Sequence, residues 1–257
     1  MAGGPYETVT SASGAERVPG TSDTGTASAS GWERVPEAVA YRQVRENLSR
    51  LLTSRPDAGG IPVAACPEWT VRDVIAHLVE ICARVTGRSG ERPAAEAPSG
   101  GDAGLADLLA AWADAGEQVE RLVAAGAARR APILVMDAFT HELDVRHALG
   151  VPPPAGHPAY PGALDVVVSG FSAEVDRRGL PPLRIETDGT WWVAGQGGPP
   201  VATLGAPRHD LLRSLAGRRT HAQIAELSWS EDPGPWLPAF AWGPFVPPER
   251  PAEDAVS

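Results

Sequence analysis

The 257-residue sequence contains no lysine, and all 22 of its basic residues are arginine. Enzymes that hold a substrate as a Schiff base on lysine are therefore excluded, as are nucleotide-binding loops of the Gly-x-x-x-x-Gly-Lys type. Acidic residues outnumber the arginines, 32 to 22, and the formal net charge is −10. This charge predicts that the protein has no nucleic-acid partner, because it repels a phosphate backbone.

Cysteine and long apolar runs are also scarce. The two cysteines, Cys66 and Cys82, are too few for a disulfide framework, and we expect both to stay reduced, with Cys82 in the core. No stretch approaches the ~18 continuous apolar residues of a membrane helix, and the first residues lack the apolar run of a secretion signal. We therefore expect a soluble, cytoplasmic protein that does not bind membranes.

The distribution of apolar residues predicts a helical domain over residues 35–150. Residues 1–34 are rich in Gly, Ser, Thr and Ala, which favours a disordered tail. Apolar positions then recur at helical spacing in four segments, joined by links that favour an up-down four-helix bundle. The segments are Pro36–Ser54, Thr70–Gly87, Leu105–Ala124, and a last one that follows Arg129 and Arg130 and ends at Gly150. Gly90–Gly104 is predicted to be a flexible loop that either overhangs a site or serves as a spacer.

A proline-rich linker at 151–157 separates this bundle from a region with a different pattern. A helix over Tyr160–Arg178 precedes two alternating segments joined by Asp188-Gly189, which predict a hairpin of strands Leu183–Thr187 and Thr190–Ala194. The remaining predicted elements are a strand at Val201–Leu204 and helices at His209–Leu215 and Thr220–Leu227. Residues 158–248 are thus expected to form a small mixed domain, with a tail at 249–257, and the predicted fold class is α+β.

The fourth predicted helix carries the clearest functional pattern, because Asp137, His141 and Asp144 share one stripe at helical spacing. Residues four apart have Cβ atoms about 5–6 Å apart, so Asp137 and His141 can bind one metal ion. His77, which lies among apolar residues of the second helix, would supply a third ligand. A hydrogen bond on a helix surface, or a core histidine satisfied by a carboxylate, explains the same residues without a metal, and spacing alone leaves both interpretations open.

Two stretches, Cys66–Leu78 and His141–Gly150, resemble the two signatures of the mycothiol-dependent maleylpyruvate isomerase family, one of the DinB-like metalloproteins. The resemblance implies a DinB-like bundle that binds a divalent metal, usually zinc, through His77, Asp137 and His141. The family's best-known members carry glutamate where this chain has Asp137, so the carboxylate here is one methylene shorter. The resemblance also implies that mycothiol is the cosubstrate, and the bias toward Ala, Gly, Pro and Arg agrees with an actinobacterial source.

The C-terminal region resembles the sterol-carrier-like domain attached to many members of that family, most clearly in Asp210–Arg219. An arginine of this region is implicated in the family's activity, and Arg218 is the matching position. The resemblance therefore implies a catalytic role for Arg218. A solvated arginine, or a charge that interacts with the end of a helix, is an equally open interpretation.

Three protein ligands leave the fourth position of a tetrahedral ion open, as in catalytic zinc sites. Because a metal deprotonates a coordinated thiol, we predict a transferase or isomerase in which a low-molecular-weight thiol attacks a small electrophile. Asp144 is expected to orient a ligand histidine or pair with an arginine, and Glu142 to face solvent. A metal-dependent hydrolase with Glu80, Glu142 or Asp144 as its base stays open. A noncatalytic metal-binding or ligand-binding module stays open too, as does the choice between monomer and homodimer.

Overall fold

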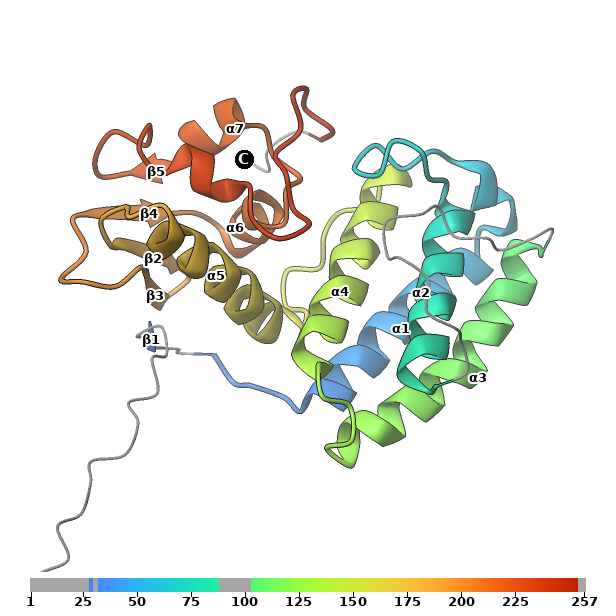
Figure 1. Ribbon diagram of the computed structural model, residues 1–257. Coiled ribbons are helices and arrows are strands. Elements are labelled where there is room, and N and C mark those ends of the chain that lie inside the picture. Colours follow the sequence, from blue (N-terminus) through green and yellow to red (C-terminus); the bar gives the residue numbers. More distant parts are fainter. Residues whose placement is uncertain (1–27, 30–31, 88–102, 254–257) are drawn as a thin grey trace, which may run out of the picture.

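The computed structural model describes residues 28–29, 32–87 and 103–253, which form a helical domain beside a mixed domain (Figure 1). The helical domain is the predicted four-helix bundle, coloured blue to yellow. Its helices are α1 (Glu37–Thr53), α2 (Val71–Val85), α3 (Leu105–Ala124) and α4 (Ala131–Ala148). Residues 88–102, and with them most of the predicted Gly90–Gly104 loop, lie outside the described residues. None of the helices described combines the length and the apolar character that crossing a bilayer requires.

The start of α2 is fixed by a capping box, as its sequence predicts. The Thr70 hydroxyl accepts a hydrogen bond from the backbone N–H of Asp73, whose carboxylate accepts one from the Thr70 N–H at 2.9 Å. This arrangement satisfies two N–H groups that the first turn of a helix otherwise leaves unpaired. Because it fixes the residue at which α2 begins, it also fixes the side of the helix on which His77 lies.

The first two helices, α1 and α2, lie diagonally across the bundle from each other. α1 packs against α3 and α4, and α2 packs against the same two helices, whereas α1 and α2 make few close approaches in the described structure. α2 and α4 are therefore direct neighbours. This contact brings the two predicted metal-binding segments together.

Helix α4 is buried on nearly all sides, because the bundle packs on one side of it and the mixed domain on the other. Leu134 to Val145 are all buried except Asp137, which is half-buried. The expectation that Glu142 faces solvent is therefore wrong, since its side chain is fully buried. Its carboxylate accepts hydrogen bonds from Arg146 Nε at 2.8 Å and from Asn47 Nδ2 at 3.2 Å. The spacing of residues along the helix predicts the direction in which the Glu142 side chain points, but it does not predict which residues cover that side chain.

The mixed domain is built on a five-stranded sheet with the order β1-β3-β2-β4-β5. Strands β2 (Leu183–Thr187) and β3 (Thr190–Ala194) form the predicted hairpin, and both turn residues have positive φ. The other elements are α5 (Tyr160–Arg177), β4 (Ala202–Gly205), α6 (Arg208–Leu215), α7 (His221–Ala225) and β5 (Ser228–Trp229). β4 pairs in parallel with β2, and α5 packs against both β3 and α6. The α+β class is confirmed, and the likeness to a sterol-carrier domain stays a prediction.

The predicted tails and linker are more structured than their composition indicates. The disordered tail over 1–34 does not extend to its end, because β1 (Ser28–Ala29) pairs with Trp191 and Trp192 of β3, and Arg34 forms an ion pair with Asp165. Residues 1–27 lie outside the described residues. Likewise His157, at the end of the predicted linker, is buried and stacks on Phe139. Composition misses such contacts because backbone pairing and distant packing leave little local pattern.

The packing of α5 against the end of the chain gives a stability prediction. A Cβ atom at Gly170 would overlap the indole ring of Trp242, whereas one at Gly162 in the same helix would meet open space. We expect Gly170→Ala to lower the free energy of unfolding by about 1–3 kcal/mol through overpacking. Gly162→Ala, the matched control, is expected to leave it unchanged or raise it by up to about 1 kcal/mol. Urea denaturation of both variants measures the difference, and equal midpoints would contradict it.

Candidate metal centre

The three predicted metal ligands lie together at the contact between α2 and α4. Their donor atoms all fall within 4.8 Å of one another. His77 Nε2 lies 3.4 Å from one oxygen of Asp137, and His141 Nε2 lies 3.8 Å from the other. The ring centroids of the two histidines are 5.0 Å apart. Side chains 60 residues apart in the sequence thus converge on one point.

These donor atoms fit a zinc-sized ion. Two atoms bonded at about 2.0–2.1 Å to a tetrahedral ion lie about 3.3–3.4 Å apart, so only small adjustments separate the observed spacings from that geometry. Asp137 therefore reaches the site despite being shorter than glutamate. In addition, His77 Nε2 and Asp137 Oδ2 are buried and have no hydrogen-bond partner in the described part of the chain. Buried polar atoms are rarely left unpaired, and a cation between these two would satisfy both.

Asp144 contacts His141 at Nδ1, the ring nitrogen that does not face the other two predicted ligands. Its Oδ2 lies 3.1 Å from His141 Nδ1, and a hydrogen bond there fixes the tautomer that leaves Nε2 free to bind a metal. Asp144 is fully buried and also accepts hydrogen bonds from Arg213 Nη2 at 2.6 Å and Arg218 Nη2 at 2.9 Å. Both of the contacts expected of Asp144, with a histidine and with an arginine, are thus present. Because both arginines belong to the mixed domain, the two domains together build the surroundings of the site.

The surroundings of His141 favour positive charge. Burial alone would lower the pKa of His141, but the Asp144 hydrogen bond, Cys66 and the Asp137 carboxylate outweigh it and raise that pKa to about 10. Burial would likewise raise the pKa of Asp137, whereas the two histidines lower it. For Asp144, the guanidinium groups of Arg218 and Arg213 overcome burial and hold the pKa well below its usual value. A site that stabilises a proton on His141 in this way also stabilises a metal cation.

Trp69, which the sequence pattern did not single out, covers the two histidines. Its ring centroid lies 5.1 Å from that of His77 and 5.8 Å from that of His141, with the rings of Trp69 and His141 nearly parallel. An apolar ring in this position shields one side of the site from water. Trp69 lies inside the Cys66–Leu78 signature, immediately before the N-cap of α2, so its place in that motif was the available signal.

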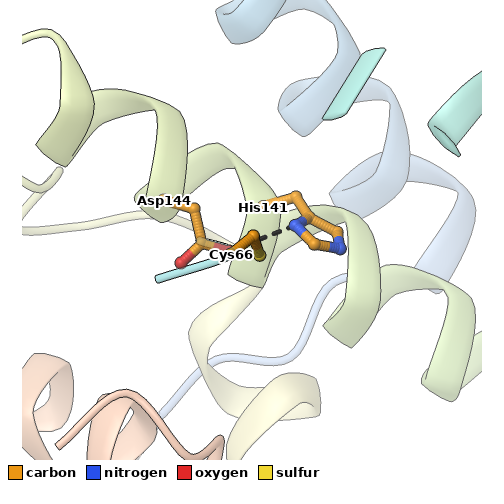
Figure 2. A group of neighbouring side chains, drawn as sticks. All are labelled: Cys66, His141 and Asp144. Atoms are coloured by element: carbon orange, nitrogen blue, oxygen red, sulfur yellow. Dashed lines mark hydrogen bonds and ion pairs between the residues drawn. The ribbon is translucent and has the colours of Figure 1, made fainter. Parts of the chain in front are cut away.

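A second group of potential ligands shares His141 with the first. Figure 2 shows the Cys66 thiol beside the ring of His141 and the carboxylate of Asp144, and the donor atoms of all three lie within 4.8 Å of one another. However, the oxygens of Asp144 already accept hydrogen bonds from Arg213 and Arg218. A cation there would face two guanidinium groups at close range. The geometry therefore favours His77, Asp137 and His141 as the ligand set.

Two other residues considered from the sequence, Arg218 and Glu80, lie in different surroundings. Arg218, the predicted catalytic arginine, is mostly buried, and besides binding Asp144 it donates to the carbonyl of Ala216 at 2.7 Å. Glu80 lies on α2 and is half-buried.

Two further residues near the site, Arg213 and Glu253, which interact at 2.6 Å, were not predicted from the sequence. Arg213 was detectable as a charge within a leucine-rich helix, whereas the sequence around Glu253 offered no pattern.

The helical part of the sequence and the overall fold are similar to known proteins. Residues 40–157 match the model of the DinB superfamily. The fold is similar to the crystal structure of a histidine-to-alanine mutant of the mycothiol-dependent maleylpyruvate isomerase, with a TM-score of 0.50, 16% identity, and coverage of 76% of this chain and 92% of that one. A second crystal structure of that isomerase matches with a TM-score of 0.46 and 17% identity over the same shares of both chains. No curated protein sequence matches the chain significantly. The helical domain is thus similar to the DinB superfamily over residues 40–157, a little less than half of the chain.

Proposed function

We propose that this chain is a metal-dependent enzyme that uses a low-molecular-weight thiol, mycothiol in the first instance, as a transferase or isomerase acting on a small electrophile. The observation that supports this proposal best is the convergence of His77, Asp137 and His141, with His77 Nε2 and Asp137 Oδ2 buried and facing each other at 3.4 Å. The fold likeness to a mycothiol-dependent isomerase suggests which thiol to test first.

The residues of this chain have separate tasks in the proposal. His77, Asp137 and His141 would hold the ion, for which zinc is the first choice because its sites combine imidazole and carboxylate ligands. When bound, zinc would lower the pKa of a coordinated thiol, so that the thiol reacts as a thiolate. Asp144 keeps His141 in the tautomer that binds metal, and Trp69 excludes water from one side. Exclusion of water favours a thiol over hydroxide as the nucleophile.

Arg218 is the residue that we propose to meet an anionic group of the thiol or the electrophile. Each of its terminal nitrogens carries two N–H groups, and the contacts with Asp144 and Ala216 use one on each. The remaining N–H groups can bind a carboxylate, for which the planar guanidinium is well shaped. The thiolate sulfur would add to one carbon of a double bond conjugated to a carbonyl; the π bond breaks, its electron pair moves onto the carbonyl, and uptake of a proton gives a conjugate. If the carbon–carbon bond instead rotates before the electron pair returns and expels the thiolate, the double bond re-forms in isomerised form.

A hydrolase is disfavoured by the carboxylates around the site. Asp144 is bound by two arginines, and Glu142 by Arg146 and Asn47, so neither is free to take a proton from water. A general base must reach the proton that it removes, directly or through one water. Two of the three carboxylates considered as the base of a hydrolase, Asp144 and Glu142, are thus already engaged, which favours thiol chemistry over hydrolysis with either of them.

Metal removal tests the proposal. We expect protein purified without added metal to contain about one zinc per chain, and to catalyse the reaction of mycothiol with a panel of electrophiles that includes maleylpyruvate. Dialysis against a chelator should reduce the rate at least about 100-fold, and added Zn²⁺ should restore it, because the ligands remain in place. Buffer with Zn²⁺ but no protein is the control. Metal-free protein that is fully active would refute the proposal, and metal-loaded protein that consumes no thiol would indicate a binding module.

A further inference from the structure

The last described residue, Glu253, lies buried at the boundary between the two domains. Its carboxylate accepts a hydrogen bond from Arg213 Nε at 2.6 Å and forms an ion pair with Arg219. Its backbone carbonyl accepts a hydrogen bond from Gln223 Nε2 at 2.8 Å. The residue is only 6% exposed, so the tail predicted at 249–257 is anchored at Glu253. The end of the described chain is thus fixed at both its side chain and its backbone.

Arg213 connects Glu253 to the metal centre. It is fully buried, and each of its three nitrogens has a different partner. Nε donates to Glu253, Nη2 donates to Asp144 at 2.6 Å, and Nη1 donates to the carbonyl of Thr140 at 3.3 Å. Thr140 immediately precedes His141 in α4. Arg213 therefore fixes both the carboxylate that orients His141 and the main chain beside it.

The buried arginines of this cluster are matched by as many carboxylates, one of which is Glu253, and His147 Nδ1 also lies 3.7 Å from Glu253. Arg213, Arg218 and Arg219 supply three positive charges, and the facing carboxylates are Asp144, Asp210 and Glu253. Neutralising Glu253 would leave an uncompensated guanidinium in a buried region next to the metal centre. Buried charges interact strongly because little water screens them, so a cation would then bind less well.

We infer that Glu253 is a positioning residue for the metal centre: it holds Arg213 against Asp144, which orients His141, and it balances the buried arginine charge. This inference rests on the proposed function only in requiring that the centre binds a metal. It assigns the end of the described chain, 112 residues beyond His141 in the sequence, a part in building the site.

Cobalt binding to the full-length protein tests this inference. We expect Glu253→Gln, which keeps the size of the side chain but removes its charge, to bind Co²⁺ about five- to tenfold more weakly than wild type. Residues that hydrogen-bond directly to a metal ligand typically change metal affinity by about 10–100-fold. The loss expected for Glu253 is at or below the lower end of this range, because Glu253 acts through Arg213 and Asp144. Glu253→Asp, which keeps the charge, should be intermediate. Glu226→Gln, an exposed carboxylate beside α7, is the matched control and should bind as wild type does.

The visible absorption spectrum of bound Co²⁺ separates positioning from general stability. We expect the spectrum of Glu253→Gln to differ from that of wild type and of Glu226→Gln, because His141 is held less firmly. Circular dichroism establishes that each variant is folded, and if Glu253→Gln is not, Glu253→Asp should still bind at least about twofold more weakly than wild type. Wild-type affinity and spectrum in the folded Glu253 variants would overturn the inference alone. A wild-type protein that binds no Co²⁺ or Zn²⁺ would overturn the proposed function.

Discussion

Replacing Asp144 with asparagine is expected to lower the free energy of unfolding of the metal-free protein by about 3–5 kcal/mol. Asp144 is fully buried and binds Arg213 and Arg218, so its neutralisation leaves two buried guanidinium groups short of a counter-charge. Removing one partner of a buried ion pair is costly because the remaining charge stays out of water. Denaturation by urea in the presence of a chelator measures this effect without any contribution from bound metal.

The control for this variant is Asp188→Asn, which makes the same chemical change at an ion pair near the surface. Asp188 accepts a hydrogen bond from Arg208 Nε at 2.6 Å, but this pair is in contact with water, because the Arg208 and Asp188 side chains are 30% and 42% exposed. Exposed pairs contribute about 0–1 kcal/mol, so this variant should be almost as stable as wild type. If both variants were equally stable, the buried arginines would not depend on Asp144. The same Asp144→Asn protein should also bind metal about 10–100-fold more weakly, because His141 loses the group that orients it.

Replacing His77 with alanine is expected to weaken metal binding at least about 100-fold, and to abolish thiol transfer with it. The substitution leaves only Asp137 and His141, and two ligands rarely hold zinc against water. We expect His141→Ala to have an effect of similar size. Elemental analysis of the purified variants and competition with a chromophoric chelator measure the loss.

Two control variants locate the effect at the proposed ligands. His221, the first residue of α7, is an exposed histidine, and His221→Ala should retain metal at wild-type affinity. Cys66→Ser removes a member of the alternative group and should also retain it. If instead Cys66→Ser lost the metal while His77→Ala kept it, the ion would belong to the group of Cys66, His141 and Asp144.

Local sequence signals predicted most of the fold. The bounds of α3, β2 and β3 agree with the predicted segments, because helical and alternating patterns are local and the turn residues Asp188 and Gly189 favour positive φ. The capping box of Thr70 was predictable for the same reason, since both partners lie within four residues. His77, Asp137 and His141 were candidates by residue type and by the four-residue spacing of two of them, but the spacing left other interpretations open, and the resemblance to the isomerase family singled them out.

Features that depend on distant contacts were not predictable in this way. The angle of Glu142 around α4 was correct, but the burial of its side chain depends on Asn47, Arg146 and the packing of His157. The partners of Asp144 lie about 70 residues further along the chain, and no periodic pattern joins them. Such contacts exist only once both domains have docked, so a single sequence read in local windows misses them.

The pairing of β1 with β3 has a consequence for how the protein can be divided. The described part of the chain starts at the edge of the mixed domain's sheet, passes through the whole helical bundle, and then returns to complete the mixed domain. A fragment cut at the 151–157 loop would therefore contain a sheet whose outer strand, with Trp191 and Trp192, lacks its neighbour. Unpaired strand edges with apolar side chains promote aggregation. A fragment that contains the mixed domain alone should accordingly carry residues 28–35 fused to its N-terminus, so that β3 keeps β1 as its neighbouring edge strand.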